Sequence, residues 1–374
     1  MAGIYIHIPF CKQACHYCNF HFSTNHQLMP GIIDAIINEA LIRKNYLQDK
    51  VETIYFGGGT PSLIKIADLE RIISQIKMLF QVSDTVEITL ESNPDDISES
   101  NLIAWKKAGI NRLSIGVQSF NDIDLSWMNR AHNAAEAENS LKIAKLYFNN
   151  ITIDLIYGSP TLTDAQWEKN IKLAISYNIP HLSCYALTVE TKTALSLLIE
   201  KHKKENIDTN KQAHHFDLMV KWLQEAGYEH YEISNFAVPE FRSKHNCSYW
   251  NGKHYLGLGP SAHSFNGISR QWNIANNALY IKSIENGVPD FEIENLTASQ
   301  QLNEYIMTGL RTIEGISIPF IKKQWNILAA TKMEQSALKW LSTKHLSEAE
   351  GILKLTQKGK FLADGIAADL FQLD

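Results

Sequence analysis

The chain is organised around the stretch Cys11-Lys12-Gln13-Ala14-Cys15-His16-Tyr17-Cys18, which follows a short apolar run at residues 4–8. Its three cysteines have the spacing C-x3-C-x2-C. Three thiolates on one short loop can each bind one iron of a [4Fe-4S] cluster, although most such clusters use four cysteines. Position 20 holds Phe20, and the remaining cysteines, Cys184 and Cys247, lie far along the chain. The spacing therefore predicts a cluster with one iron open to a non-protein ligand, and an open position is typical of catalytic metal sites.

Spacing alone leaves two alternatives open. A structural zinc ion would need a fourth ligand, and His16, His21 and His26 are close enough in sequence to supply one. The three thiols could also have no connection with a metal. The residues on either side of the cysteines favour the cluster.

These flanking residues resemble the radical S-adenosylmethionine (SAM) superfamily. The run Tyr5-Ile6-His7-Ile8-Pro9-Phe10 leads directly into Cys11, and an aromatic residue, Tyr17, precedes the last cysteine of the motif. Within the superfamily, essentially the whole chain is similar to the oxygen-independent coproporphyrinogen III oxidases (HemN) and the related heme chaperones (HemW). The resemblance implies Cys11, Cys15 and Cys18 as cluster ligands and SAM as the ligand of the open iron.

The composition is that of an ordinary globular protein. The chain has 374 residues, of which 45% are hydrophobic and 20% charged, and its formal net charge is -5. The negative charge argues against general nucleic-acid binding, and no apolar run approaches the roughly 18 residues of a membrane span. The start, Met1-Ala2-Gly3-Ile4, lacks the features of a signal peptide. Clustered cysteines suit a reducing compartment, so we expect a cytoplasmic protein.

Apolar runs alternate with helical patterns through the first half of the chain. Strands are expected at residues 4–8, 53–56, 86–91, 112–117, 151–158 and 181–185, and helices at 31–48, 67–80, 98–108, 134–147 and 163–177. This alternation predicts parallel pairing with right-handed crossovers. Six units are too few for a closed eight-stranded barrel. The expected fold class is α/β, with the partial (β/α)6 barrel that the resembled superfamily has.

The pattern is weaker in the second half. Residues 192–226 look helical with a polar break near 204–210, residues 228–236 look extended, residues 239–269 look loop-rich, and helices are expected at 276–286 and 298–311. From about residue 312, two or three helices surround an apolar run at 351–355. That order resembles a winged helix, with a plain helical bundle as the alternative. We expect three parts: a radical SAM partial barrel at 1–230, a connecting region at 231–311 and a mostly helical, winged-helix-like domain at 312–374.

Unusual residues gather after the predicted strands, at the edge where parallel α/β sheets bind ligands. Gly57-Gly58-Gly59-Thr60-Pro61 follows the second strand. Glycines let a backbone approach a ligand closely, and a tight turn without a ligand is the alternative. Asp154 lies inside an apolar strand, where a carboxylate is costly unless it is paired. We therefore expect Asp154 to meet Arg130 or a ligand, although a structural salt bridge is the common role of such residues.

The resemblance assigns these residues to SAM. Tyr5, Gly58 and Glu91 match positions that contact a first SAM. A second set matches positions that contact a second SAM in the oxidase: Gly59, Thr60, Gln118, Arg130 and Asp154, with Ala186 as a further match.

The stretch His245-Asn246-Cys247-Ser248-Tyr249-Trp250 places an imidazole beside an aromatic pair. This composition suits a flat aromatic ligand with a metal centre, and a packed structural corner is the alternative. The stretch matches the H-N-x-x-Y-W motif shared by HemW and its relatives. The resemblance implies heme as a ligand and His245 as its axial ligand, with Cys247 and His263 as further candidates.

Two departures favour HemW over HemN. The oxidase carries C-x3-C-x2-C-x-C, whereas the last of these positions is Phe20 here. The oxidase also has an N-terminal extension that helps to build its substrate site, whereas this chain begins three residues before its first expected strand. The HemW resemblance implies heme, an acceptor protein for the heme and a homodimer as partners.

Two other functions stay open at this point. One is the oxidative decarboxylation of coproporphyrinogen III by radical chemistry. The other is a DNA-binding regulator that acts through the C-terminal winged helix, against which the acidic balance argues.

Overall fold

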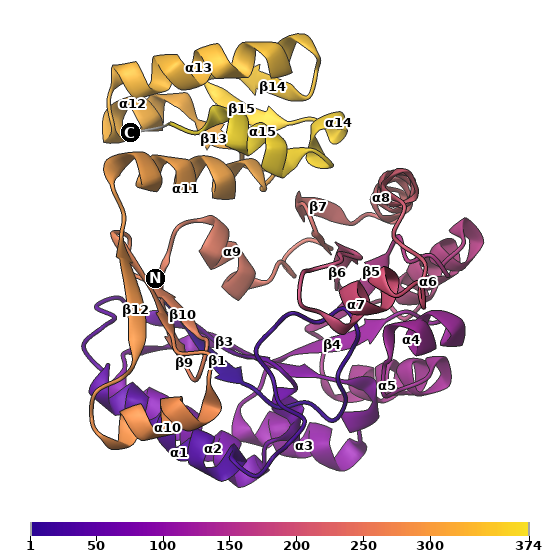
Figure 1. Cartoon of the computed structure of the whole chain (residues 1–374), viewed down its shortest axis with the longest axis vertical. Helices are drawn as coiled ribbons and strands as arrows, with labels where there is room; N and C mark the ends of the chain where they lie inside the picture. Colours follow the sequence, from indigo (N-terminus) through magenta and orange to yellow (C-terminus); the bar gives the residue numbers. More distant parts are fainter. Residues whose placement is uncertain (1, 373–374) are drawn as a thin grey trace.

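Six parallel strands pair in chain order at the centre of the structure, a computed structural model that describes residues 2–372. They are β1 (Ala2–Ile8), β2 (Val51–Gly58), β3 (Val82–Ser92), β4 (Arg112–Gln118), β5 (Ile151–Tyr157) and β6 (His181–Ala186). Five helices alternate with them: α1 (Met29–Ile42), α2 (Ile66–Leu79), α3 (Glu99–Ala108), α5 (Ala134–Tyr147) and α6 (Asp164–Ser176). These helices cover the outer face of the curved sheet (Figure 1). The predicted partial (β/α)6 barrel is therefore confirmed.

The outer face of the barrel strands is apolar. Ile4, Ile54 and Ile88 stand in register across β1, β2 and β3, and Ile153 and Leu182 do so across β5 and β6. All five are essentially without exposed surface and belong to one cluster that the outer helices complete. Burying one such side chain contributes about 1.5–3 kcal/mol, so this layer supplies much of the stability of the barrel.

The inner face is polar. Ser114 on β4 pairs with Thr152 on β5, which in turn pairs with His181 on β6. The buried guanidinium of Arg112 donates to Thr152 Oγ1, and the Thr152 hydroxyl lies 3.0 Å from Nδ1 of His181. Buried parallel strands usually carry apolar side chains on both faces. A polar interior indicates that this face binds something other than packed side chains.

The sheet continues beyond the barrel at both edges, and within residues 2–372 it has 12 strands. On the β1 side it is extended by β9 (His254–Leu258), which is parallel to β1, and then by antiparallel β10 (His263–Phe265), β11 (Ser269–Asn273) and β12 (Phe291–Asn295). On the β6 side it is extended by antiparallel β8 (Asn235–Ala237) and β7 (Glu229–Glu232).

The prediction of a loop-rich segment at 239–269 was wrong. It contains α9 (Lys244–Trp250), β9 and β10. Gly257 lies inside β9, where an added Cβ would stand 2.1 Å from the carbonyl oxygen of His263. The glycine is there for close strand approach and not for a turn.

The remaining helices flank the sheet: α4 (Asp122–Met128), α7 (Ala194–Glu200), α8 (Thr209–Glu225) and α10 (Asn277–Glu285). The break between α7 and α8 confirms the polar interruption expected near 204–210. The helix α4 was not among the predicted elements. No helix within residues 2–372 is both long and apolar enough to cross a bilayer.

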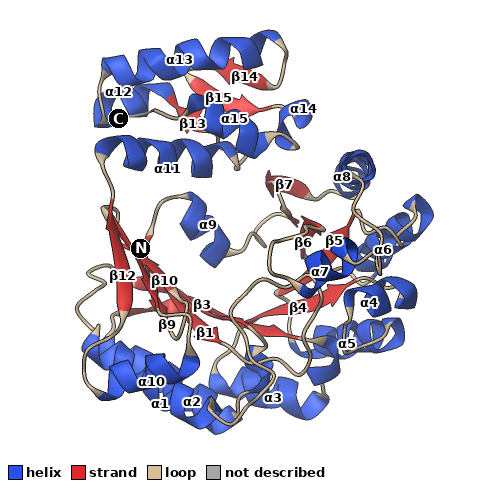
Figure 2. Ribbon diagram, in the orientation of Figure 1, coloured by secondary structure: helices blue, strands red, loops and turns tan. Residues whose placement is uncertain are grey.

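The C-terminal unit follows β12. Its elements are α11 (Ala298–Leu310), β13 (Ile316–Ser317), α12 (Ile318–Gln324), α13 (Ile327–Ser342), β14 (Leu346–Ala349), β15 (Ile352–Leu355), α14 (Gln357–Lys360) and α15 (Ala363–Leu370). The three strands form an antiparallel sheet in the order β13-β15-β14. This sheet excludes the plain helical bundle, and the element order is that of a winged helix. Figure 2 shows the unit set apart from the large sheet.

The three-part division of the chain remains a proposal. A separate apolar cluster, which includes Leu302, Ile321 and Leu353, supports an independent C-terminal core, but it begins in α11, before residue 312. The strands of residues 231–311 share the sheet of the barrel. The outermost residues of the predicted ranges, 1 and 373–374, lie outside the described residues.

The C-terminal unit contacts the barrel through the edge strand β7. Arg311 donates to Oε1 of Glu232 through Nε (3.1 Å) and Nη2 (3.0 Å). The backbone N–H of Ile313 donates to the carbonyl of Tyr231 (3.0 Å), and that of Ile233 donates to the carbonyl of Arg311 (3.1 Å). Side-chain and main-chain bonds thus join the two parts at this edge, and Arg270 on β11 forms a further ion pair with Glu304 on α11.

A first prediction concerns the packing of Gly59. An added Cβ would lie 2.6–2.8 Å from backbone atoms of Phe10 and Ile8, which have no flexible end that can move aside. We expect Gly59→Ala to lower the free energy of unfolding by about 1–3 kcal/mol, measured by denaturant titration of the cluster-free protein. The control is Gly365→Ala in α15, where an added Cβ meets no atom within 4 Å and a helical alanine is favourable. Equal midpoints for the two variants would contradict the packing argument.

Candidate functional site

A cavity of about 800 Å³ opens at the C-terminal ends of the barrel strands. Its lining contains the predicted site residues Cys11, Cys15, Cys18, Gly58, Gly59, Thr60, Glu91, Gln118, Arg130, Asp154 and Ala186. Tyr5 and His245 do not line it. The structure thus brings together residues from the loops after β1, β2, β3 and β4 and from β5 and β6, as parallel pairing predicts.

The helix α4 and the residue after it hold the cysteine loop. The backbone N–H of His16 donates to the carbonyl of Met128 (3.1 Å). The side chains of Asn129 and Gln13 each donate to a backbone carbonyl of the other segment, Asn129 to Ala14 (2.7 Å) and Gln13 to Asn129 (3.0 Å). The loop is therefore fixed to β4 through the segment that sequence analysis left without structure.

Arg130 lies directly behind the cysteines. Its Nη1 donates to Sγ of Cys15 (3.2 Å), and its Nη2 donates to Oδ1 of Asn93 (2.6 Å) and to the carbonyl of Gly116 (2.9 Å). The expected Asp154–Arg130 ion pair is not formed, because the guanidinium is used by these partners. Asp154 instead lines the cavity, next to its strand partner Ser183 on β6.

Asn93 is a site residue that sequence analysis missed. Its amide accepts from Arg130 and donates to Oγ1 of Thr60 (3.2 Å). Thr60 in turn hydrogen-bonds the Cys11 thiol, whose pKa burial raises to about 11. Asn93 thereby connects the groups that hydrogen-bond two of the three sulfurs. Its position before Pro94, directly after the third predicted strand, is the feature of the sequence that could have indicated a site residue.

The three thiols suit a cluster better than a single zinc ion. Among the described residues, no three His, Cys, Asp or Glu side chains converge on one ion position, whereas each cysteine of a cluster binds a different iron. The nearby histidines hydrogen-bond elsewhere: His16 to the carbonyl of Trp127, His21 to Asn277 and His26 to the carbonyl of Cys11. Cys184 and Cys247 do not line the cavity, so its lining supplies three thiols, as a cluster with one open iron requires.

The glycine loop packs against the cysteine loop. Gly58 has φ 105°, a left-handed conformation, and an added Cβ would lie 2.5 Å from the His7 ring. The close packing of the two loops is therefore enough to explain the glycines at these positions, without a ligand. Gln118, at the end of β4, has φ 64° without being a glycine. Such conformations are strained and cluster at ligand-binding sites.

Two carboxyl groups in the cavity hold protons unusually tightly. Burial raises the pKa of Glu91 to about 7, although a hydrogen bond from Tyr55 (2.7 Å) opposes the rise. Burial raises the pKa of Asp154 to about 6. A cationic ligand in the cavity would favour the ionised forms of both, so this wall is suited to an amino or sulfonium group.

Tyr5 lies beside the cavity wall and not in it. Its hydroxyl is 3.2 Å from Nδ1 of His7, and its ring stacks on Tyr55, which donates to Glu91. Its link to the cavity is therefore indirect.

His245 is enclosed in the protein. The side chain is 1% exposed, its Nδ1 lies 2.8 Å from Oγ1 of Thr53 and its Nε2 lies 2.8 Å from the hydroxyl of Tyr249. Burial lowers the pKa of His245 to about 3. This is the packed arrangement that was the alternative for the motif. Heme ligation by His245 stays a prediction, and it would require one of these hydrogen bonds to break.

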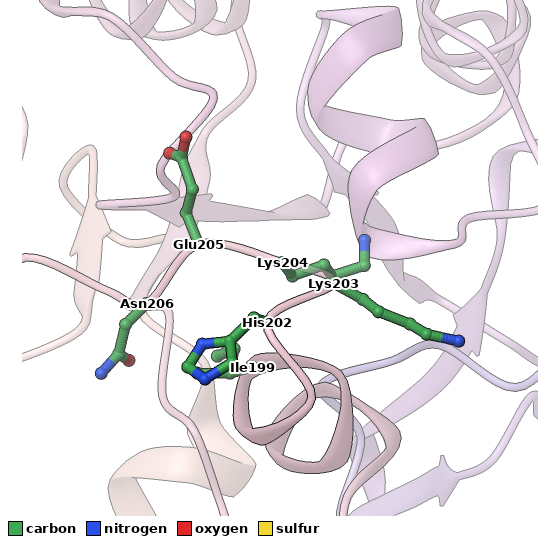
Figure 3. A pocket seen from close by; sticks show the side chains of 6 residues that line it. All are labelled: Ile199, His202, Lys203, Lys204, Glu205 and Asn206. Carbon is green, nitrogen blue, oxygen red and sulfur yellow. The ribbon is translucent and has the colours of Figure 1, made fainter.

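The other heme-ligand candidates lie apart from the cavity. His263 is exposed on β10 and stacks on Trp272, and Cys247 lies on α9. A separate hollow of about 450 Å³ is lined by Ile199 in α7 and by residues 202–206 after this helix. The side chains of the loop residues point in different directions (Figure 3). No predicted site residue lies there.

Comparison with known proteins agrees with this architecture. Residues 5–174 match the Radical SAM superfamily, and residues 296–362 match the HemN C-terminal domain. Over 374 residues the chain is 35% identical to "Heme chaperone HemW" of Bacillus subtilis, with 98% of each chain covered. The chain belongs to the HemW family of radical SAM proteins. HemW of Mycobacterium tuberculosis is 30% identical, with 98% of this chain and 94% of the relative covered.

A solved structure outside the HemW family shares the fold. Coproporphyrinogen III oxidase (HemN) from Escherichia coli superposes with a TM-score of 0.85 over 99% of this chain and 90% of its own length, at 22% identity. That likeness establishes the arrangement of the elements and no more.

The enclosed state of His245 predicts a pH dependence. An unfolded chain protonates this imidazole near pH 6.5, whereas the folded chain resists protonation down to about pH 3. The stability contributed by the neutral imidazole is therefore present above about pH 6.5 and is lost as the pH falls. In His245→Phe, the decline in unfolding free energy below about pH 6 should be less steep by up to about 1.4 kcal/mol per pH unit.

The measurement is denaturant unfolding between about pH 7.5 and pH 5. At the upper end, the variant should be less stable by about 1–3 kcal/mol, because Thr53 and Tyr249 lose their partner. The control is His202→Asn, at an exposed position with φ 53° that asparagine tolerates. An unchanged slope in His245→Phe would show that solvent already reaches this imidazole.

Proposed function

We propose that this chain is a heme chaperone that binds a [4Fe-4S] cluster, SAM and heme and passes the heme to an acceptor protein. The observation that carries the proposal is the 35% identity to a heme chaperone over 98% of both chains. The cavity with its three cysteines supports the first two ligands. A homodimer as the working assembly is part of the same proposal.

In this proposal Cys11, Cys15 and Cys18 hold the cluster. Arg130 and Thr60 already hydrogen-bond Cys15 and Cys11, and such donors orient thiolate ligands and stabilise their negative charge. A cluster with an open iron supplies a coordination position for SAM and, when reduced, an electron.

The residues matched to SAM fall into two groups, one for each SAM. Glu91 and Gly58 lie on the wall where the two carboxyl groups favour a cation, which suits the amino group of a first SAM. Tyr5 would act through Tyr55 and Glu91. The assignment of a second SAM to Gly59, Thr60, Gln118, Arg130, Asp154 and Ala186 remains part of the proposal, and all six line the same cavity.

Phe20 argues against the oxidase. It stands where the resembled oxidases carry a fourth cysteine, and its side chain is exposed and lines the cavity. The likeness to HemN extends to the fold, which many functions can share. We therefore propose no decarboxylation of coproporphyrinogen III.

The cluster assignment predicts the iron content. Anaerobic reconstitution should give about four irons per chain. Cys11→Ser, Cys15→Ser and Cys18→Ser should each lose most of this iron and the visible absorbance of the cluster. The matched controls, Cys184→Ser and Cys247→Ser, should retain both, because neither residue lines the cavity. Loss of the cluster in Cys184→Ser would contradict the three-ligand site.

The chaperone proposal is tested by heme titration of the reconstituted protein, followed by the Soret absorbance with the cluster contribution subtracted. We expect saturable heme binding by the wild type and no conversion of coproporphyrinogen III in an anaerobic assay with SAM and a reductant. His245→Ala and His263→Ala test the predicted ligands. A variant that lacks the side chain that binds the heme iron should show a shifted Soret band. Absence of heme binding by the wild type, or robust decarboxylation, would overturn the proposal.

A further inference from the structure

The C-terminal unit supplies a second wall of the cavity. Residues 360–365, from the end of α14 to the first turn of α15, line it from one side. Phe216 on α8 is buried beneath them, with its ring 6.0 Å from that of Phe361. Phe361 and Leu362 are more than 40% exposed although they belong to this lining. Large apolar side chains left exposed in a cavity mark a binding surface.

Lys360 lies on the same wall with a neutral partner. Its Nζ is 2.8 Å from Nδ1 of His230, while Nε2 of His230 is 3.0 Å from the carbonyl of Ile233. A carbonyl only accepts, so Nε2 carries the imidazole hydrogen and Nδ1 accepts from the ammonium. Among the described residues, no carboxylate forms an ion pair with Lys360. Burial lowers the pKa of Lys360 to about 8, so the group is mostly charged at neutral pH.

The acids around Lys360 are already engaged. Oε1 of Glu232 accepts two hydrogen bonds from Arg311, and its Oε2 accepts from Asn235 (2.6 Å) and from the N–H of Ser234 (3.1 Å). Asp364 accepts from Arg311 (3.0 Å). The charge of Glu232 favours the charged form of Lys360 but forms no ion pair with it, so an anionic group of a ligand would offset the remaining cost of burying this cation.

We propose that Lys360 binds a carboxylate of a flat, largely apolar ligand that lies in the cavity against the exposed side chains of Phe361 and Leu362. The inference rests on the proposed function, under which this ligand is heme and the carboxylate is one of its two propionates. The site does not use His245, which is outside the cavity lining.

The experiment compares heme with heme dimethyl ester, which has the same macrocycle but no carboxylates. Titrations use the reconstituted wild type, Lys360→Met and the control Lys358→Met. Lys358 lies on the same helix, is exposed and donates to the carbonyl of Thr343. The wild type and Lys358→Met should bind heme about tenfold tighter than the ester. Lys360→Met should bind heme about tenfold more weakly, with no change for the ester.

Three further measurements sharpen the test. The preference of the wild type for heme over the ester should disappear as the pH rises well above 8, because Lys360 loses its proton. Iron content and the unfolding midpoint show whether Lys360→Met is folded. The proposed site takes the place of ligation by His245, so His245→Ala should keep the heme affinity of the wild type.

The outcomes separate the inference from the proposed function. Heme binding that is unchanged in Lys360→Met, or an equal loss for heme and ester, would overturn the role of Lys360 while leaving the chaperone proposal standing. A wild type that binds neither heme nor the ester would overturn both.

Discussion

Two backbone hydrogen bonds between the glycine loop and the cysteine loop set the geometry on which the cavity depends. The N–H of Gly59 donates to the carbonyl of Ile8 (2.9 Å), and the N–H of Thr60 donates to the carbonyl of Phe10 (2.7 Å). These bonds continue the parallel pairing of β1 and β2 past the ends of the strands. No side chain fits between the two segments, so the first two loops of the barrel form one unit. The Thr60 hydroxyl of this unit contacts one of the cysteine sulfurs. Asn93 links Thr60 to the guanidinium of Arg130, which contacts another.

The barrel was predictable because its signals are local. Each of its strands is an apolar run, and each run is followed by a helical period or a turn, so the order and direction of β1 to β6 followed from the sequence. The edge strands β9 to β12 carry no such signal. They are short, polar on one face and interrupted by Gly257, whose role depends on the approach of His263 from another strand. These strands form because of contacts between segments that are distant in the sequence. A local sequence pattern does not show such contacts.

The site was predictable to a similar depth. The cysteine spacing and the residues after each strand end correctly marked the loops that meet at the cavity. Side-chain direction was not accessible: His245 stands in a conspicuous motif yet faces inward onto Thr53 and Tyr249, and Arg130 binds Asn93 and not Asp154. Lys360 carries no sequence signal at all, because its importance comes from the docking of α14 against His230.

The docking of the C-terminal unit has a thermodynamic consequence. Arg311 joins the unit to Glu232 on the barrel edge, and residues 360–365 of the same unit close the cavity. Any ligand that touches both walls must strengthen their association by the free energy it gains from the second wall, and association must strengthen ligand binding equally. Ligand binding in the cavity should therefore make the short connection between β12 and α11 more resistant to proteolysis and slow its amide hydrogen exchange.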